Sequence, residues 1–296
     1  MNGKLLRSIL FVPANVPRFV QKASSCMADA IVLDLEDSVP FDQKIQTRKA
    51  LEKSIADLSK SHASIMVRVN NTPDLLEDDV QTAVCERLDA LFVPKVDSAD
   101  QIVKLDYLTK EIEATKGLDV GRIRFSIHIE SPLGLLRLEN IVASCDRIES
   151  ISLGIDDYCL AMGIELTKDA SALLTPMSQV AITAKAYGVI PTGVLGSVAE
   201  FRDLKAFANS AFRAKELGFE GSICVHPDQV SILNRIFVPD SESLAKARRI
   251  IEAFEEAAQI GRASTTLDGR MVDTPIYRKA LATLKKFDSV KKRGGF

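Results

Sequence analysis

The chain has 296 residues, of which 46% are hydrophobic, so it is long enough to bury a large core. Its 38 basic and 40 acidic residues leave a formal net charge of -2, which argues against nucleic acid or an anionic membrane as a partner. No membrane-spanning run or signal peptide is recognised, and the five cysteines form no C-x-x-C pair, so we expect a cytoplasmic protein with reduced thiols and no structural zinc site.

Short apolar runs rich in Ile and Val recur along most of the chain, each followed by a longer segment of helical period. Runs that are apolar throughout are typical of parallel strands buried on both faces. The pattern predicts eight strands, at Ser8–Val12, Ala30–Leu35, Ile65–Val69, Ala90–Val93, Phe125–Ile129, Ile148–Leu153, Val189–Val194 and Ser222–Val225.

Segments of helical character lie between the predicted strands. They include Asp42–Leu58, Ser98–Ala114 with Ser98 as its N-cap, and Phe201–Leu217, which ends before Gly218. Eight alternations of strand and helix favour a closed (β/α)8 TIM barrel. An open doubly wound sheet is the structural alternative.

After the eighth predicted strand the pattern changes. We expect a long helix at Ser241–Gln259, a polar loop at Gly261–Arg270, a last helix at about Pro275–Phe287 and a frayed tail from Lys291. The chain would then consist of a barrel catalytic domain at 1–235 and a C-terminal helical extension at 236–296. The polar loop is predicted to be a lid that contributes to a neighbouring subunit's site, with Gly269 as its hinge.

Polar residues follow six of the predicted strands, at the ends where a barrel places its active site. Charged side chains avoid a barrel interior unless they are paired or bind an ion. Several carboxylates beside two cations suit a divalent metal together with an anionic substrate. The set comprises Asp34-Leu35-Glu36-Asp37, Arg68 and Asn70, Pro94-Lys95, His128-Ile129-Glu130, Gly154-Ile155-Asp156-Asp157 and His226-Pro227.

Carboxylates without neighbouring cysteines or clustered histidines suit a hard cation such as magnesium, with manganese as the alternative. Magnesium takes few protein ligands and keeps positions for water and substrate. Glu130 and one of Asp156 or Asp157, at the ends of adjacent strands, are the natural pair. Spacing alone does not choose between the two aspartates.

Eleven motifs follow one another in order along nearly the whole chain. They are Arg7-Ser8-Ile9-Leu10-Phe11-Val12-Pro13, Pro17-Arg18, Ala28-Asp29-Ala30, Asp34-Leu35-Glu36-Asp37-Ser38-Val39, Val67-Arg68-Val69-Asn70, Val93-Pro94-Lys95-Val96, Ile129-Glu130-Ser131-Pro132-Leu133-Gly134, Leu153-Gly154-Ile155-Asp156-Asp157-Tyr158, Leu217-Gly218-Phe219-Glu220-Gly221, Val225-His226-Pro227-Asp228-Gln229-Val230 and Asp268-Gly269-Arg270-Met271-Val272-Asp273-Thr274-Pro275. Each motif alone is weak evidence, whereas the whole set is specific. Together the motifs resemble those of the citrate lyase beta chains and related CoA-ester lyases of the HpcH/HpaI aldolase family.

The resemblance implies a magnesium-dependent barrel enzyme that is a homo-oligomer, a trimer or a hexamer, and that cleaves citryl-, malyl- or citramalyl-thioesters. It places the metal ligands on Glu130 and Asp157 and the substrate-binding arginine on Arg68. It places a general acid/base that acts across a subunit boundary on Asp273. The pair Glu36-Asp37 is implied to lie near the metal, through water.

Further residues are candidates for binding the substrate or CoA, namely Arg18, Lys22, Lys95, Pro132 and His226. Arg18 and Lys22, one turn apart on the first helix, suit a phosphate of CoA or of a carrier protein. The alternative for these two is an ordinary solvated helix face. His226 precedes a proline and is also interpreted as a structural hydrogen-bonding residue.

Two catalytic candidates have structural alternatives of their own. Arg68 can simply pair with Glu36 or Asp37, and Asp273 before Thr274-Pro275 is equally typical of a helix N-cap. One position also departs from the family. Many relatives have lysine after the glycine of the eighth strand, where this chain has Ser222, so a role for that lysine does not carry over.

These residues suit the cleavage of a 3-hydroxyacyl thioester into an acetyl thioester and a 2-keto acid. A magnesium ion chelated by the substrate's hydroxyl and carboxylate lowers the hydroxyl pKa. Arg68 can stabilise oxyanion charge with a fixed, protonated fork. Asp273 is suited to protonate the enolate carbon.

Three rival functions remain open from the sequence. The first is a citrate lyase beta subunit, which acts on a citryl group carried by an acyl carrier protein. The second is a pyruvate aldolase of the class II type, which acts on free hydroxy-keto acids and needs no carrier-binding surface. The third is a regulatory barrel without turnover, which the intact set of Glu130, Asp157, Arg68 and Asp273 argues against.

Overall fold

The computed structural model describes residues 5–292, which fall into two compact units divided at Asn234 and Arg235. In the first unit, eight parallel strands form a sheet in the order β7-β6-β5-β4-β3-β2-β1-β8. The strands are β1 (Ser8–Pro13), β2 (Ala30–Asp34), β3 (Ser64–Arg68), β4 (Ala90–Val93), β5 (Arg124–Ile129), β6 (Ile148–Leu153), β7 (Ile190–Pro191) and β8 (Ser222–Cys224).

The two end strands of this order, β7 and β8, meet just beyond β7. Thr192 and Gly221 form a parallel bridge, the amide of Glu220 donates to the carbonyl of Pro191 (3.0 Å), and the amide of Gly193 donates to the carbonyl of Gly221 (2.8 Å). The sheet therefore closes into a TIM-like barrel, as predicted, and the doubly wound alternative is wrong. Strand β7 is shorter than the predicted Val189–Val194, since Pro191 has no N–H with which to extend the ladder.

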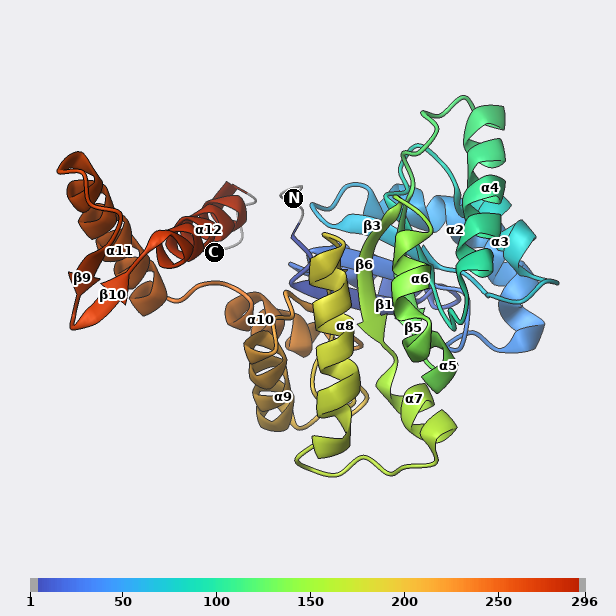
Figure 1. Ribbon diagram of the computed structural model, residues 1–296. Helices are drawn as coiled ribbons and strands as arrows, with labels where there is room; N and C mark the ends of the chain where they lie inside the picture. Colours follow the sequence, from blue (N-terminus) through green and yellow to red (C-terminus); the bar gives the residue numbers. More distant parts are fainter. Residues whose placement is uncertain (1–4, 293–296) are drawn as a thin grey trace. The chain divides into compact units, whose positions relative to one another are not determined.

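The strands are buried on both faces because the barrel has a packed interior and an outer ring of helices (Figure 1). One core cluster contains the fully buried side chains of Ile9, Val32, Met66 and Phe92. The intervening residues, such as Leu33, are equally buried. This two-sided burial explains why the strand sequences are apolar throughout instead of alternating.

Ten α-helices accompany the strands of the first unit, and the predicted N-cap at Ser98 is confirmed. The Ser98 hydroxyl accepts from the amide of Gln101, whose side chain accepts from the amide of Ser98 in return. The helices are α1 (Pro17–Ala23), α2 (Lys44–Leu58), α3 (Leu76–Ala83), α4 (Ala99–Thr115), α5 (Pro132–Leu136), α6 (Leu138–Ala143), α7 (Ile155–Met162), α8 (Leu174–Ala186), α9 (Leu204–Glu216) and α10 (Pro227–Ile236), with short 3-10 turns at Phe41–Gln43 and Ser171–Leu173.

The second unit contains α11 (Ser241–Gln259), a hairpin of β9 (Thr265–Leu267) and β10 (Arg270–Val272), and α12 (Thr274–Lys292). The first predicted helix is confirmed. The prediction of a polar loop at Gly261–Arg270 is wrong in part, because Thr265–Leu267 and Arg270–Val272 pair as antiparallel strands. The turn between them is Asp268–Gly269, and both of its residues have positive φ. Most of the predicted frayed tail and the segment 1–4 lie outside the described residues.

No helix within residues 5–292 has both the length and the apolar character needed to cross a membrane. All five cysteines are free thiols. Cys159 and Cys224 are buried, while the other three are partly exposed.

We predict that Gly221→Ala destabilises the protein by about 3 kcal/mol or more, because overpacking against backbone cannot be relieved by a rotamer change. A Cβ at Gly221 would lie 1.7 Å from the carbonyl oxygen of Leu6, beside the bridge that closes the barrel. Urea unfolding measures the change. Gly117→Ala is the control, since Gly117 has positive φ but open space, and should cost only about 1 kcal/mol. Equal losses in the two variants would contradict the prediction.

Candidate active site

Arg68 lies at the centre of a cluster of charges at the carboxyl ends of the strands. Its Nε and Nη2 donate to the two carboxylate oxygens of Asp34, both at 2.6 Å, and its Nη1 lies 3.1 Å from Glu36. The guanidinium also lies over the ring of Phe11, 5.0 Å from its centroid. Asp34 and Arg68 are cross-strand neighbours in the register of β2 and β3, which brings their side chains together.

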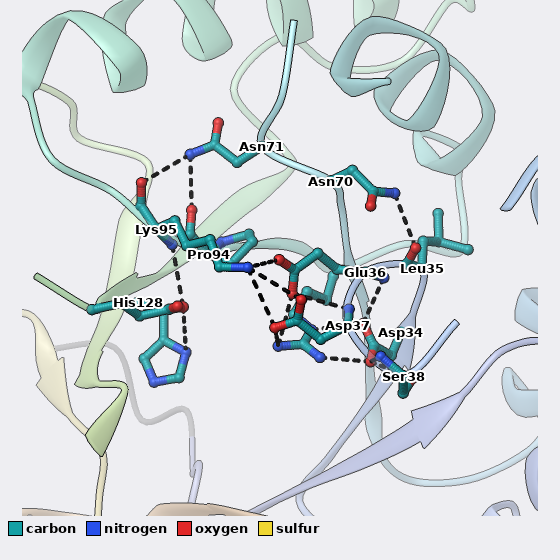
Figure 2. A network of polar contacts seen from close by, with 12 residues as sticks. Asp34, Leu35, Glu36, Asp37, Ser38, Asn70, Asn71, Pro94, Lys95 and His128 are labelled. Carbon is teal, nitrogen blue, oxygen red and sulfur yellow. Dashed lines mark hydrogen bonds and ion pairs between the residues drawn. The ribbon is translucent and has the colours of Figure 1, made fainter. Parts of the chain in front are cut away.

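Lys95 extends this cluster from the end of β4. Figure 2 shows its amine pointing toward Glu36 and Asp37; it contacts the carboxylate of Glu36 and lies 3.2 Å from that of Asp37. The backbone amide of Lys95 donates to Glu130 (3.2 Å). Lys95 has a positive φ of 53°, an uncommon conformation for a residue with a Cβ and one that is enriched at functional sites. Lys95 thus joins the ends of β2, β4 and β5.

The carboxylates of this cluster differ in acidity. Burial alone would raise the pKa of Asp34, but the Arg68 fork and Ser38 hold that pKa below its usual value. Burial raises the pKa of Glu36, although Arg68 and Lys95 oppose the rise. The pKa of Asp37 is lowered, because hydrogen bonds and the charge of Lys95 outweigh its burial. Asp34 and Asp37 are therefore the firmly ionised partners of the two cations.

The loop that carries Glu36 is held by Lys44, at the start of α2. The Lys44 amine donates to the carbonyls of Leu35 (2.9 Å) and Glu36 (2.8 Å) and to the side chain of Asn70 (2.7 Å). Sequence reasoning missed this role, because Lys44 lies inside a segment of ordinary helical pattern. Asp34 was expected in the cluster, but the sequence suggested Glu36 or Asp37 as the partner of Arg68.

Glu130, just after the end of β5, has a buried carboxylate whose negative charge is not fully balanced by hydrogen bonds or cations. It is 6% exposed, and its Oε2 has no hydrogen-bond partner within the described residues. Burial, together with the charges of Asp157 and Glu36, raises the pKa of Glu130 to about 8. An unpaired buried oxygen beside further carboxylates is the environment that a cation would stabilise.

Two neighbours fix the position of Glu130. His128 is buried, and burial followed by the charge of Arg68 lowers its pKa to about 3, so its imidazole is neutral; its Nδ1 lies 3.3 Å from Glu130 Oε1. A Cβ at Gly154 would lie 2.5 Å from Glu130 Cγ. Gly154 is thus needed for the close approach of β6 to the Glu130 side chain.

The donors fit a magnesium ion that keeps most of its shell for water and substrate. Within the described part of the chain, no group of three His, Cys, Asp or Glu side chains is arranged to bind a metal, whereas Glu130 and an aspartate of α7 offer the two carboxylates that magnesium typically takes. Asp156 accepts from the Ser197 hydroxyl (2.9 Å). Asp157 is the aspartate whose charge acts on Glu130, which favours Asp157 as the second ligand.

Two cavities lie beside Arg68 and share Phe11, Arg68 and Val225. The larger, of about 390 Å³, is also lined by Leu10, Val12, Pro13, Phe19, Lys22, Ala23, Asp34, Ser38, His226 and Pro227. The smaller, of about 170 Å³, is also lined by His128, Ser152, Leu153, Gly154, Ile155, Asp156, Asp157, Gly193, Val194, Gly196, Val198, Ser222 and Ile223. The larger cavity has Lys22 at its wall, and the smaller cavity has Asp156 and Asp157; Glu130 lines neither.

Of the four other candidates, two line the larger cavity and two line neither. Lys22 lines the larger cavity, while Arg18 is exposed on the same helix and its guanidinium lies over the Phe19 ring. His226 lines the larger cavity too, stacked on Phe201 with ring centroids 5.2 Å apart. Pro132 is the first residue of α5 and lines neither cavity.

Asp273 belongs to the second unit. Its carboxylate accepts from the amide of Ile276 (3.2 Å) and caps α12. This is the structural alternative named for it from the sequence, and one carboxylate oxygen suffices for such a cap. Its predicted role as an acid/base stays a prediction.

Comparison with known proteins decides the family. Residues 7–227 match the HpcH/HpaI aldolase/citrate lyase family. The chain belongs to this family. The resemblance inferred from the motifs is confirmed, as is the enzyme class, an oxo-acid carbon–carbon lyase of the citrate lyase beta/malyl-CoA lyase type.

Two relatives match over almost their whole length. The chain is 32% identical to an L-malyl-CoA/beta-methylmalyl-CoA lyase of Rhodobacter capsulatus, with 98% of this chain and 96% of the relative covered. It is 29% identical to the citrate lyase subunit beta of Leuconostoc mesenteroides subsp. cremoris, with 96% of this chain and 94% of the relative covered. The crystal structure of CitE from Mycobacterium tuberculosis with magnesium, acetoacetate and coenzyme A has the same fold, with a TM-score of 0.74, 24% identity and coverage of 95% and 97%.

We predict that magnesium raises the melting temperature of the wild-type protein but not that of Glu130→Gln. Without metal, the difference in melting temperature between the two proteins depends on pH. The folded pKa of Glu130, about 8, lies above the ordinary 4.5, so this residue lowers stability increasingly as pH rises between these values. In EDTA at about pH 9, Glu130→Gln should melt above wild type, and at about pH 4 the two should coincide.

Glu52→Gln is the control for this measurement, because Glu52 is an exposed glutamate of α2. It should follow wild type with and without magnesium. A wild-type melting temperature that ignores magnesium, or a Glu130→Gln variant that still responds to it, would remove Glu130 from the metal site.

Proposed function

We propose that the protein is a magnesium-dependent lyase that cleaves a 3-hydroxyacyl thioester into an acetyl thioester and a 2-keto acid. The observation that carries the proposal is the buried Glu130 carboxylate, with an unpartnered oxygen and with Asp157 and Glu36 close enough to raise its pKa. A carboxylate pair in this state suits a metal, and family membership assigns carbon–carbon cleavage. The relatives with malyl-CoA and citrate lyase names support a thioester as substrate.

Glu130 and Asp157 would hold magnesium, and Glu36 and Asp37 would contact it through water. When bound, the metal supplies Lewis-acid polarisation of the substrate's hydroxyl and carboxylate oxygens. The Glu130 side chain is already oriented for this by the Lys95 amide and by the close approach of Gly154.

Arg68 is the group proposed to stabilise negative charge at the thioester carbonyl as the carbon–carbon bond breaks. Asp34 takes two of its nitrogens in a bidentate pair, and this fixes the plane of the guanidinium. Its Nη1 remains directed to Glu36 (3.1 Å) and Asp37 (3.9 Å), on the side of the metal carboxylates. A guanidinium held in place beforehand needs no reorganisation when the enolate forms.

The larger cavity is proposed to receive the CoA or acyl-carrier arm. Lys22 at its wall suits a phosphate, and its apolar residues suit the uncharged part of the arm. This cavity also weighs against the aldolase that acts on free hydroxy-keto acids, which has no use for such a surface. The CitE structure from Mycobacterium tuberculosis contains coenzyme A, which agrees with a CoA thioester as the substrate.

The test is a cleavage assay with malyl-, citramalyl- and citryl-CoA, with and without magnesium, and with products identified by mass. We expect magnesium-dependent release of acetyl-CoA and a 2-keto acid from at least one of them. Arg68→Lys should lower kcat/KM by about 100-fold or more, because lysine cannot reproduce the fork. Cleavage of free hydroxy-keto acids alone, without a rise in melting temperature on adding CoA, would favour the aldolase.

Asp273 is proposed to exchange a proton with the enolate carbon of a substrate bound in a neighbouring subunit of a homo-oligomer, a trimer or hexamer. Asp273→Asn and Glu130→Gln should each be inactive alone. Mixed and reassembled in equal amounts, they should recover about one quarter of wild-type activity, because that fraction of sites combines an intact barrel with an intact neighbour. Each variant reassembled with itself is the control. Full activity of Asp273→Asn, or no recovery on mixing, would contradict this role.

A further inference from the structure

Aliphatic side chains line the smaller cavity, which Asp156 and Asp157 also line. Val194 and Val198 follow β7, Ile223 belongs to β8, and Val225 follows it. Phe11 completes this side. Such a wall favours hydrogen or a small alkyl group and offers nothing to replace the hydration of a charge.

The charges around this cavity are mostly negative. Arg68 is the only cation among the described residues that line it, and Asp34 already takes two of its nitrogens. Asp156 and Asp157 occupy the first turn of α7, so the positive end of that helix already has anions beside it. Lys95 does not line the cavity, and its amine is held by Glu36 and Asp37.

The remaining polar groups of the wall carry no positive charge. The Ser222 hydroxyl donates to the carbonyl of Ile223 (2.9 Å). His128 and Ser152 are 6% and 1% exposed and have side-chain atoms without hydrogen-bond partners in the described chain. They suit a neutral oxygen, or water, better than a second anion.

We propose that the keto-acid side of the site accepts hydrogen or methyl beside the hydroxyl-bearing carbon and excludes a carboxymethyl group. The substrate class is then malyl- or citramalyl-thioesters, not citryl-thioesters. The metal carboxylates account for one substrate carboxylate, through the ion they hold. A second carboxylate would face the aliphatic wall and the α7 aspartates without a partner. This inference rests on the proposed function, whose metal site it uses.

The test is binding of the free products, glyoxylate, pyruvate and freshly prepared oxaloacetate, measured by titration calorimetry with magnesium present. We expect oxaloacetate to bind at least about 10-fold more weakly than whichever of glyoxylate and pyruvate binds more tightly, because its second carboxylate would be buried without a partner. Oxaloacetate that binds as tightly as pyruvate overturns the inference. This readout does not need turnover. If the products keep the expected order but no thioester is cleaved, the proposed lyase function fails and the subsite stands.

A supplied cation should reduce the discrimination. Val198→Arg is expected to tighten oxaloacetate binding at least about 5-fold relative to pyruvate. Val198→Leu is the apolar control, and Val103→Arg, on an exposed residue of α4, is the charge control; both should keep the wild-type ratio. Val225→Arg repeats the test from a side chain that is 43% exposed and tolerates a charge. An unchanged ratio in both arginine variants contradicts the proposal.

Discussion

Glu130 places a carboxylate at the end of β5 where water is largely excluded, and its ionised form is costly there. The neighbouring groups do little to reduce that cost. His128 is neutral, the Lys95 amide donates one hydrogen bond, and Asp157 adds a like charge. A fold that keeps such a group against its own stability typically does so at a functional site. This imbalance is the physical argument for the proposed metal site.

The Arg68–Asp34 pair keeps the rest of the site in place. It is a cross-strand pair within the barrel wall, so its geometry is set by the register of β2 and β3 and not by a mobile loop. Glu36 and Asp37, in the loop after β2, form ion pairs with Arg68. Lys44 stabilises this loop by donating to the backbone carbonyl of Glu36. A buried ion pair of this kind contributes little net stability, but removing one member leaves the other uncompensated.

The parts of the fold that repeat a simple pattern could be predicted from the sequence. Eight apolar runs, each followed by a helix, predict a barrel, and the barrel places polar residues such as Glu130 and Arg68 at one end. The pairing of Arg68 with Asp34 was missed because it depends on the register between two strands. The hairpin of β9 and β10 was missed because each strand has only three residues, too few to display the apolar alternation that marks a half-buried strand.

The positions of the two cavities bear on where the proposed reaction would take place. Phe11, Arg68 and Val225 line both cavities. With the proposed thioester arm beside Lys22 and the hydroxy acid beside the α7 aspartates, the bond that breaks would lie near this shared wall. Arg68 would then be placed to stabilise the negative charge that develops at the thioester carbonyl, and Asp157 would lie on the side of the hydroxyl-bearing carbon.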